Sequence, residues 1–171
     1  MGTSEVVDYD KVKSYLKKIS ESYSKVDKFI GFNEKELHIE LNKKKGIPGT
    51  LLSPFKYEGS LNGNNQRTLA GRVIHFGVLR SISKIDDYDL ESATIAECEN
   101  IGFGVLSRIY YDSKNPNSKW LYKNFDQNTV EFNELRLKSA LGLVGMEFAF
   151  TLKTSQPLVL DVNEWSDIDT L

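Results

Sequence analysis

The chain has 171 residues, a hydrophobic fraction of 40% and a formal net charge of −2 at pH 7. The length predicts one well-cored domain, and the charge excludes a general basic field that would attract nucleic acid or an anionic membrane. No run of about 18 apolar residues is present, so no membrane-spanning helix is expected. A single Cys98 excludes an intramolecular disulfide. Because no signal-peptide pattern is visible, synthesis in a reducing cytoplasm is expected.

The first predicted element is an amphipathic helix. Apolar residues recur at three- and four-residue steps from Val12 to Ile30, and lysines occupy much of the remaining helical surface. Asp8 or Asp10 lies near the positive end, and Gly31 is a suitable stop residue. The spacing predicts a helix of about five or six turns.

Strands and a long loop are predicted next. Residues 36–41 alternate apolar and polar side chains and predict a strand. Residues 50–58 predict a second strand, which Pro54 would place at a sheet edge or make irregular. Residues 58–71 are polar and rich in Gly and Asn, so they predict a long loop of functional or disordered character. Residues 72–83 predict a further strand.

A second helix is predicted from about residue 90 to residue 111. The acidic segment 84–89 is typical of a helix start. Gly102 and Gly104 lie inside this helix, where each costs roughly 1 kcal/mol relative to alanine. Their presence indicates that a sheet packs closely against the helix backbone.

Two strands and a tail complete the chain. Residues 129–141 change their apolar phase, which predicts a bulge near Asn133. Residues 143–154 alternate regularly, with large apolar residues on one side and small residues beside single charges on the other. The apolar side comprises Val144, Met146, Phe148, Phe150 and Leu152. Residues 157–171 form an acidic tail that contains Trp165.

This order of elements predicts an α+β fold. We expect a mainly antiparallel β-sheet of about four to five strands with two long helices on one face. Residues 1–156 would form a single domain, followed by the tail at 157–171. The second face of the sheet would remain open unless a partner covers it.

The sequence contains no clear catalytic or metal-binding pattern. His38 and His75 are the only histidines, and neither has partners at metal-ligand spacing. Cys98 lies on the apolar stripe of the second helix, where a thiol usually behaves as a small buried hydrophobe. The acidic clusters lack the spacing of a calcium loop. We therefore expect no enzymatic activity, cofactor or metal, and no sequence-specific binding of nucleic acid.

Residues 86–112 and 130–152 resemble the tail-completion or tail-terminator proteins of tailed phages, in particular those of phages and prophages of Bacteroidetes hosts. In such proteins a helix with an "E-x-x-E/N-x-G" centre and an "RL/RIxxD" end precedes a strand of the form "G-x-x-F-x-F-x-L". The matching residues here are Glu97, Asn100, Gly102, Arg108, Ile109, Asp112, Gly145, Phe148, Phe150 and Leu152. The segment "PLVLDVNEW" is similar to their "lCYdpdkW" close, with Trp165 as the match, although Val159 and Leu160 replace the cysteine and tyrosine. The resemblance covers roughly residues 70–165.

The resemblance implies a virion protein at the neck between head and tail. Such a protein would form a homo-oligomeric ring, six-fold in long-tailed phages or twelve-fold in short-tailed ones, which include crAss-like phages. Its partners would be neighbouring neck, portal or tail-tube proteins, and DNA would pass through the ring. The alternatives are a small non-enzymatic binding or regulatory module that acts as a monomer or dimer, and an enzyme with an unrecognised site.

A ring closed by head-to-tail contacts needs two different patches on each subunit. The small residues on the outward strand faces, the 58–71 loop and the tail are candidates for these patches. The predicted subunit interface comprises His75, Gly77, Gly145, Glu147, Ala149 and Trp165. We expect Gly145→Lys or Ala149→Glu to leave the monomer folded and to block assembly.

Overall fold

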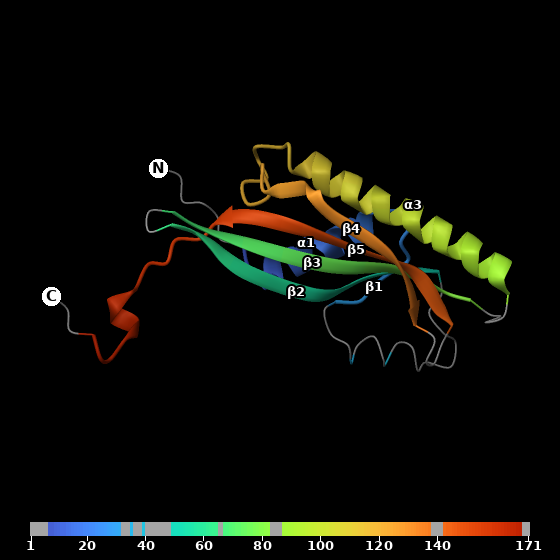
Figure 1. Ribbon diagram of the computed structural model, residues 1–171, viewed down its shortest axis with the longest axis horizontal. Coiled ribbons are helices and arrows are strands. Elements are labelled where there is room, and N and C mark those ends of the chain that lie inside the picture. The colour runs from blue at the N-terminus through green and yellow to red at the C-terminus, as the bar shows by residue number, and fades with distance from the viewer. Residues whose placement is uncertain are drawn as a thin grey trace.

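The computed structural model describes residues 7–31, 35, 39, 49–64, 67–82, 87–137 and 142–168. Within these ranges, the long helices α1 and α3 and one five-stranded sheet of order β1-β2-β3-β5-β4 can be described (Figure 1). The elements are α1 (Tyr9–Ser22), β1 (Lys28–Phe29), β2 (Thr50–Asn64), β3 (Arg67–Ser81), α3 (Tyr88–Asp112), β4 (Phe125–Leu137), β5 (Leu143–Ser155) and the short 3₁₀ helix η1 (Val162–Glu164). Only the β1–β2 pair is parallel among these strands. The predicted α+β fold with a mainly antiparallel sheet is therefore confirmed.

Both helices pack on one face of the sheet. The apolar stripes of α1 and α3 meet side chains from β2, β3 and β5 in the main core. Its largest fully buried members include Leu16 of α1, Ile101 and Ile109 of α3, Ile74 and Phe76 of β3, and Phe148 of β5. The apolar side predicted for residues 143–154 is buried throughout, and four of its five residues, Met146, Phe148, Phe150 and Leu152, belong to this core. No helix within the described ranges has the length and apolar character needed to cross a membrane.

The first helix is shorter than predicted. Asp8 caps its start, as expected for an acidic residue there, but α1 ends at Ser22 instead of continuing to Ile30. The residues that follow bind the sheet: the Asp27 carboxylate accepts the backbone N–H of Thr50 at 2.6 Å, and the Ile30 N–H donates to β2. After Ser22, hydrogen bonds to β2 replace helical hydrogen bonds. The apolar residues of this segment therefore belong to an extended strand and not to a helix.

The loop predicted at residues 58–71 is wrong, because the described residues of this stretch, 58–64 and 67–71, belong to two paired strands. The two strands, β2 and β3, have 15 residues each and pair from Thr50 opposite Arg80 to Asn64 opposite Arg67. Within the described residues, β2 pairs with β1 only at positions 51 and 52, so the rest of β2 is a sheet edge. A bulge follows Pro54 at this edge, as the proline predicts.

The bulge expected near Asn133 lies earlier in β4. The register of β4 against β5 shifts between Asp126 and Glu131. There, the Thr129 hydroxyl donates to the Asp126 carbonyl at 2.7 Å and accepts the Thr151 N–H at 2.9 Å. A side-chain hydroxyl thus substitutes for a backbone group of the ladder. The strand predicted at 36–41 lies outside the described residues apart from Ile39, which is helical.

A second, smaller apolar cluster lies on the sheet face opposite the helices. It comprises Ile30, Leu51, Leu79 and Leu143, with Leu135 and Leu137 packed against them. The four central residues are at most 2% exposed. One end of the sheet face that was predicted to be open is therefore shielded from solvent by the protein's own chain.

Candidate functional site

Five of the six predicted interface residues come together on the sheet face opposite the helices. In the register of β3 against β5, His75 lies opposite Ala149 and Gly77 lies opposite Glu147. Gly145 follows one pair further along, opposite Leu79. The sixth residue, Trp165, lies beyond β5, in the segment that extends away from the sheet (Figure 1).

The small residues of this face are buried within the chain. Ala149 is 8% exposed, and Gly77 and Gly145 are buried as well. A Cβ atom at Gly77 would lie 3.6 Å from the Leu135 side chain, whereas one at Gly145 would overlap the backbone carbonyl of Val78. A lysine at position 145 has no room without displacing a strand. This contact argues against the expectation that Gly145→Lys leaves the monomer folded, which stays a prediction.

The accessible part of the same face is polar. His75 Nδ1 lies 2.9 Å from Glu147 Oε1, and its Nε2 lies 3.9 Å from Glu58 Oε2. The His75 and Glu147 side chains remain 18% and 27% exposed. The two carboxylates fix the orientation of the imidazole, but catalysis also requires a nucleophile or a bound substrate in a pocket. His38 lies outside the described residues.

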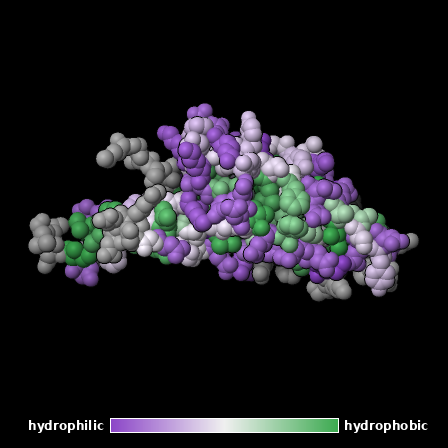
Figure 2. All heavy atoms as spheres, turned by 45° about the horizontal axis from the view of Figure 1, so that its top comes forward, coloured by the Kyte–Doolittle hydropathy of each residue, from purple (hydrophilic) through white to green (hydrophobic). Residues whose placement is uncertain are grey.

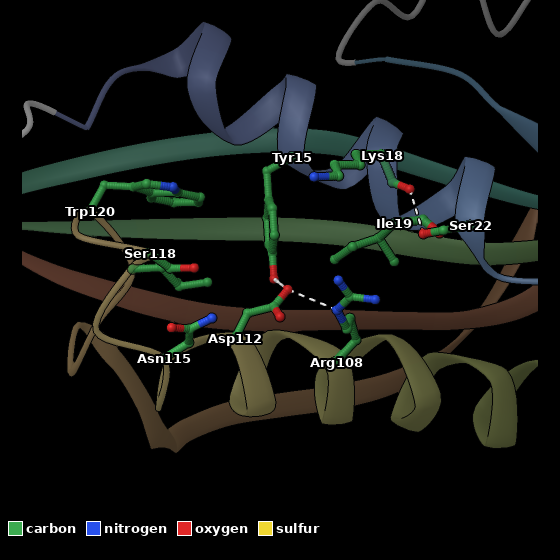
Figure 3. A pocket seen from close by; sticks show the side chains of 10 residues that line it. Tyr15, Lys18, Ile19, Ser22, Arg108, Asp112, Asn115, Ser118 and Trp120 are labelled. Carbon is green, nitrogen blue, oxygen red and sulfur yellow. Dashed lines mark hydrogen bonds and ion pairs between the residues drawn. The ribbon is translucent and has the colours of Figure 1, made fainter.

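A pocket of about 300 Å³ lies on the other side of the sheet, between α1 and α3 (Figure 3). We call it the helix pocket. It is lined by α1, by the end of α3 and by the turns that follow α3, with Tyr15, Lys18, Arg108, Asp112, Ser118 and Trp120 among its residues. Its volume is at the lower end of the range for ligand pockets.

Asp112 organises the helix pocket. Its carboxylate accepts the Tyr15 hydroxyl at 2.8 Å and the Arg108 Nε–H at 2.8 Å, so it joins the two helices. Burial, together with the hydrogen bond to this carboxylate, raises the pKa of Tyr15, and the phenol stays protonated. Trp120 packs edge-on against the Tyr15 ring, with ring centroids 5.1 Å apart.

The remaining groups at the helix pocket give it a chemical preference. Arg108 neutralises Asp112 while its own side chain stays 49% exposed. Lys18 lies on α1 at the same pocket, opposite Arg108 (Figure 3). Aromatic side chains beside two cations suit an aromatic group with an adjacent negative charge.

The chain beyond β5 carries a second unusual surface. We call residues 157–168 the C-terminal arm. Residues 157–167 are all exposed, and they include Leu158 at 71%, Val159 at 83% and Trp165 at 53%. Figure 1 shows the arm running away from the end of the sheet, and Figure 2 shows apolar side chains on it at the left of the view. Apolar surface of this kind, presented away from the domain, is typical of association.

Cys98 has a structural role. It is fully buried in the main core, and burial raises its pKa to about 11, so the thiol is protonated at neutral pH and is a poor nucleophile. The prediction of a core cysteine is confirmed. Among the described residues, no group of three or more His, Cys, Asp or Glu side chains is arranged to hold a metal ion.

Sequence reasoning missed the helix pocket. The signal was present in α3, where Arg108 and Asp112 stand four residues apart at the end of an apolar stripe. Their partner Tyr15 lies 97 positions away from Asp112, so only the packing of the two helices brings them together.

Two surfaces thus stand out, the helix pocket and the C-terminal arm. A scan of protein-family models and a search of curated proteins find no match for this chain.

Proposed function

We propose that the protein is a structural subunit of a tailed-phage virion, forming a ring at the head–tail neck as a tail-terminator, tail-completion or connector protein. It is made in the host cytoplasm, is not an enzyme, and becomes part of the virion. Its contacts are with further copies of itself, in a six- or twelve-fold ring, and with neighbouring neck, portal or tail-tube proteins.

The observation that carries the proposal is the exposed C-terminal arm. Each apolar side chain left in water forgoes about 1.5–3 kcal/mol relative to burial. Leu158, Val159 and Trp165 are all more than half exposed, while the domain beneath them has a complete core of its own. A segment of this composition gains most by binding a surface on another molecule.

A ring also requires that each subunit present two different patches. The arm is one such patch, and it leaves the domain at the end of β5. The sheet edge of β2, the polar group around His75 and the helix pocket lie elsewhere on the domain. A donor surface and a separate acceptor surface support head-to-tail contacts.

The phage context rests on the resemblance over residues 70–165. Several of the residues that carry the resemblance make specific contacts in the structure. Gly102 provides the close contact between α3 and the Phe148 ring, and Arg108 pairs with Asp112 at the helix pocket. The net charge of −2 suits a ring through which DNA passes without sticking.

The test is the state of assembly of the purified protein. Native mass spectrometry and negative-stain electron microscopy at high protein concentration should reveal closed rings of six or twelve subunits, and added tail tubes should be capped by them. A strict monomer or a closed dimer that ignores tail tubes would overturn the proposal in favour of a small binding module. A portal, major capsid or tail-tube gene beside the gene for this chain would support the phage context independently.

A further inference from the structure

We propose that the helix pocket is the acceptor site for the C-terminal arm of a second copy of this chain, with Trp165 of that copy seated between α1 and α3. This inference rests on the proposed ring function and names the contact that joins neighbouring subunits. The arm is the occupant favoured by shape, charge and reach.

The arm presents Trp165 in a defined way. The Asp161 carboxylate accepts the Asn163 N–H at 3.0 Å, and this cap starts the single turn of η1. The Trp165 N–H then donates to the Val162 carbonyl at 3.4 Å, which closes the turn. The indole therefore follows an ordered turn at an exposed position, as an anchor residue of an interface does.

The helix pocket offers room and some aromatic surface for an indole. Its volume of about 300 Å³ holds one large aromatic side chain. Trp120 and Tyr15 supply aromatic surface on one side, and edge-to-face or offset contacts with a further ring add to simple burial. Arg108 and Lys18 lie at the same pocket, where a cation can pack against an aromatic face.

Charge is complementary between the two surfaces. The arm contains Asp161, Glu164 and Asp167 and no lysine or arginine. Helix α1 contains four lysines against Asp10 and Glu21, which leaves it two positive charges in excess. Acidic residues on both sides of Trp165 would lie near Lys18 and Arg108 when the indole is seated. Such pairing sets orientation and speeds association.

Reach favours a neighbouring copy. Gln156 is tied to the hairpin, because its N–H donates to the Thr68 carbonyl at 3.0 Å and its side chain accepts from Arg72 at 2.8 Å. From this anchor the arm extends away from the domain (Figure 1), and it can span at most roughly 30 Å to Trp165 when extended. That distance is sufficient to cross onto an adjacent subunit. The contact joins two different surfaces, so repetition of it closes a ring or continues a filament.

The first experiment measures self-association of the full chain by sedimentation velocity. Trp165→Ala should weaken subunit association by about 30-fold, the factor expected for an interface anchor, and Trp165→Phe should recover much of the loss. Lys18→Glu should also weaken association, whereas Lys17→Glu is the matched control, since Lys17 pairs with Glu21 on α1 and does not line the pocket. Rings that persist unchanged in Trp165→Ala would overturn the docking and leave the ring function standing.

The second experiment locates the contact. Protein with Trp165→Cys is mixed with protein carrying Ser118→Cys under mild oxidation, while the buried Cys98 stays unreactive. A disulfide between the two different chains supports the proposal. If a chain carrying both substitutions forms only an internal disulfide and stays monomeric, the arm occupies its own pocket, and the proposal is overturned.

Binding of a peptide to the helix pocket tests this inference independently of the ring function. A synthetic peptide of residues 156–168 is titrated by calorimetry against Trp165→Ala protein. Saturable binding that Lys18→Glu weakens and Lys17→Glu does not would support the pocket as acceptor even if the intact protein forms no ring. Absence of binding, or binding that Lys18→Glu leaves unchanged, would overturn it.

Discussion

The Phe148 ring of β5 fills the space that a side chain at Gly102 of α3 would occupy. A Cβ atom at Gly102 would overlap this ring, which cannot retreat because Phe76 stacks on it with ring centroids 5.2 Å apart. The glycine lets the helix backbone approach the sheet closely, at the cost in helix propensity that the sequence indicates.

We predict that Gly102→Ala lowers stability by up to about 2 kcal/mol. Alanine gains roughly 1 kcal/mol in a helix, but overpacking a core usually costs 1–3 kcal/mol, so the steric cost prevails. Urea unfolding followed by circular dichroism measures the change. Gly104→Ala is the control, since its neighbour is the hydroxyl end of the partly buried Tyr23, which can swing aside.

A double-mutant cycle tests the same contact more directly. Phe148→Leu should lose stability alone, but Gly102→Ala should cost less in its presence because the smaller side chain leaves room for the new methyl group. Neighbours that share space normally show coupling of about 0.5–3 kcal/mol. Additive effects of the two substitutions would contradict the packing described.

Gly145 supports a second prediction. Because a Cβ at this position meets the Val78 carbonyl of the adjacent strand, we expect Gly145→Ala to destabilise the domain by about 2 kcal/mol or more, as strand displacement usually does. Thermal unfolding of the variant should show a lowered midpoint. Asn133→Ala, at an exposed position of neighbouring β4, should unfold like the parent protein.

The pattern of side chains in the sequence predicted those elements that pack regularly against the core. The alternation in residues 143–154 identified the buried side of β5, and the acidic segment 84–89 indicated the start of α3, which Asp87 caps. The hairpin from Thr50 to Ser81 was partly missed, since an edge strand with water on both sides has no apolar alternation to display. Residues such as Gly59 and Asn62 are exposed there and read as loop residues.

The candidate site was predictable only in part, for a related reason. The outward direction of Gly77 and Gly145 follows from strand periodicity, but whether their own chain covers them does not. Leu135 reaches Gly77 from β4, and its position depends on a register shift that begins at Asp126. Contacts set by the register between strands distant in sequence leave no local signal.

The buried thiol gives a third prediction. Cys98 is fully buried, with a pKa of about 11, so a thiol-specific reagent at about pH 8 should leave the folded protein unlabelled and label one thiol after unfolding. Ser118→Cys, at a partly exposed position, is the positive control and should react in the folded state. Rapid labelling of Cys98 in the native protein would contradict the burial of this helix face.

The hydrogen bond between Tyr15 and Asp112 gives the last prediction, on alkaline pH. The pKa of Tyr15 is raised above the ordinary value of 10.0 by burial first and by Asp112 second. A raised pKa contributes stability that is fully present below about pH 10 and is lost as the pH rises, because the unfolded chain then ionises and the folded one cannot. Tyr15→Phe should therefore be less stable than the parent at pH 7, by about 1–3 kcal/mol for the hydroxyl that Asp112 loses.

The same substitution should reduce the dependence on pH. From about pH 9 to pH 11, the free energy of unfolding should fall less steeply in Tyr15→Phe than in the parent protein. The variant lacks a phenol that ionises in the unfolded chain but stays protonated in the folded protein. Tyr9 and Tyr57, whose pKa values are also raised by burial, contribute equally to both proteins. Tyr88→Phe is the control for loss of a tyrosine hydroxyl, because that side chain is 76% exposed. Parallel curves for Tyr15→Phe and the parent would show that the phenol is not held against Asp112 in solution.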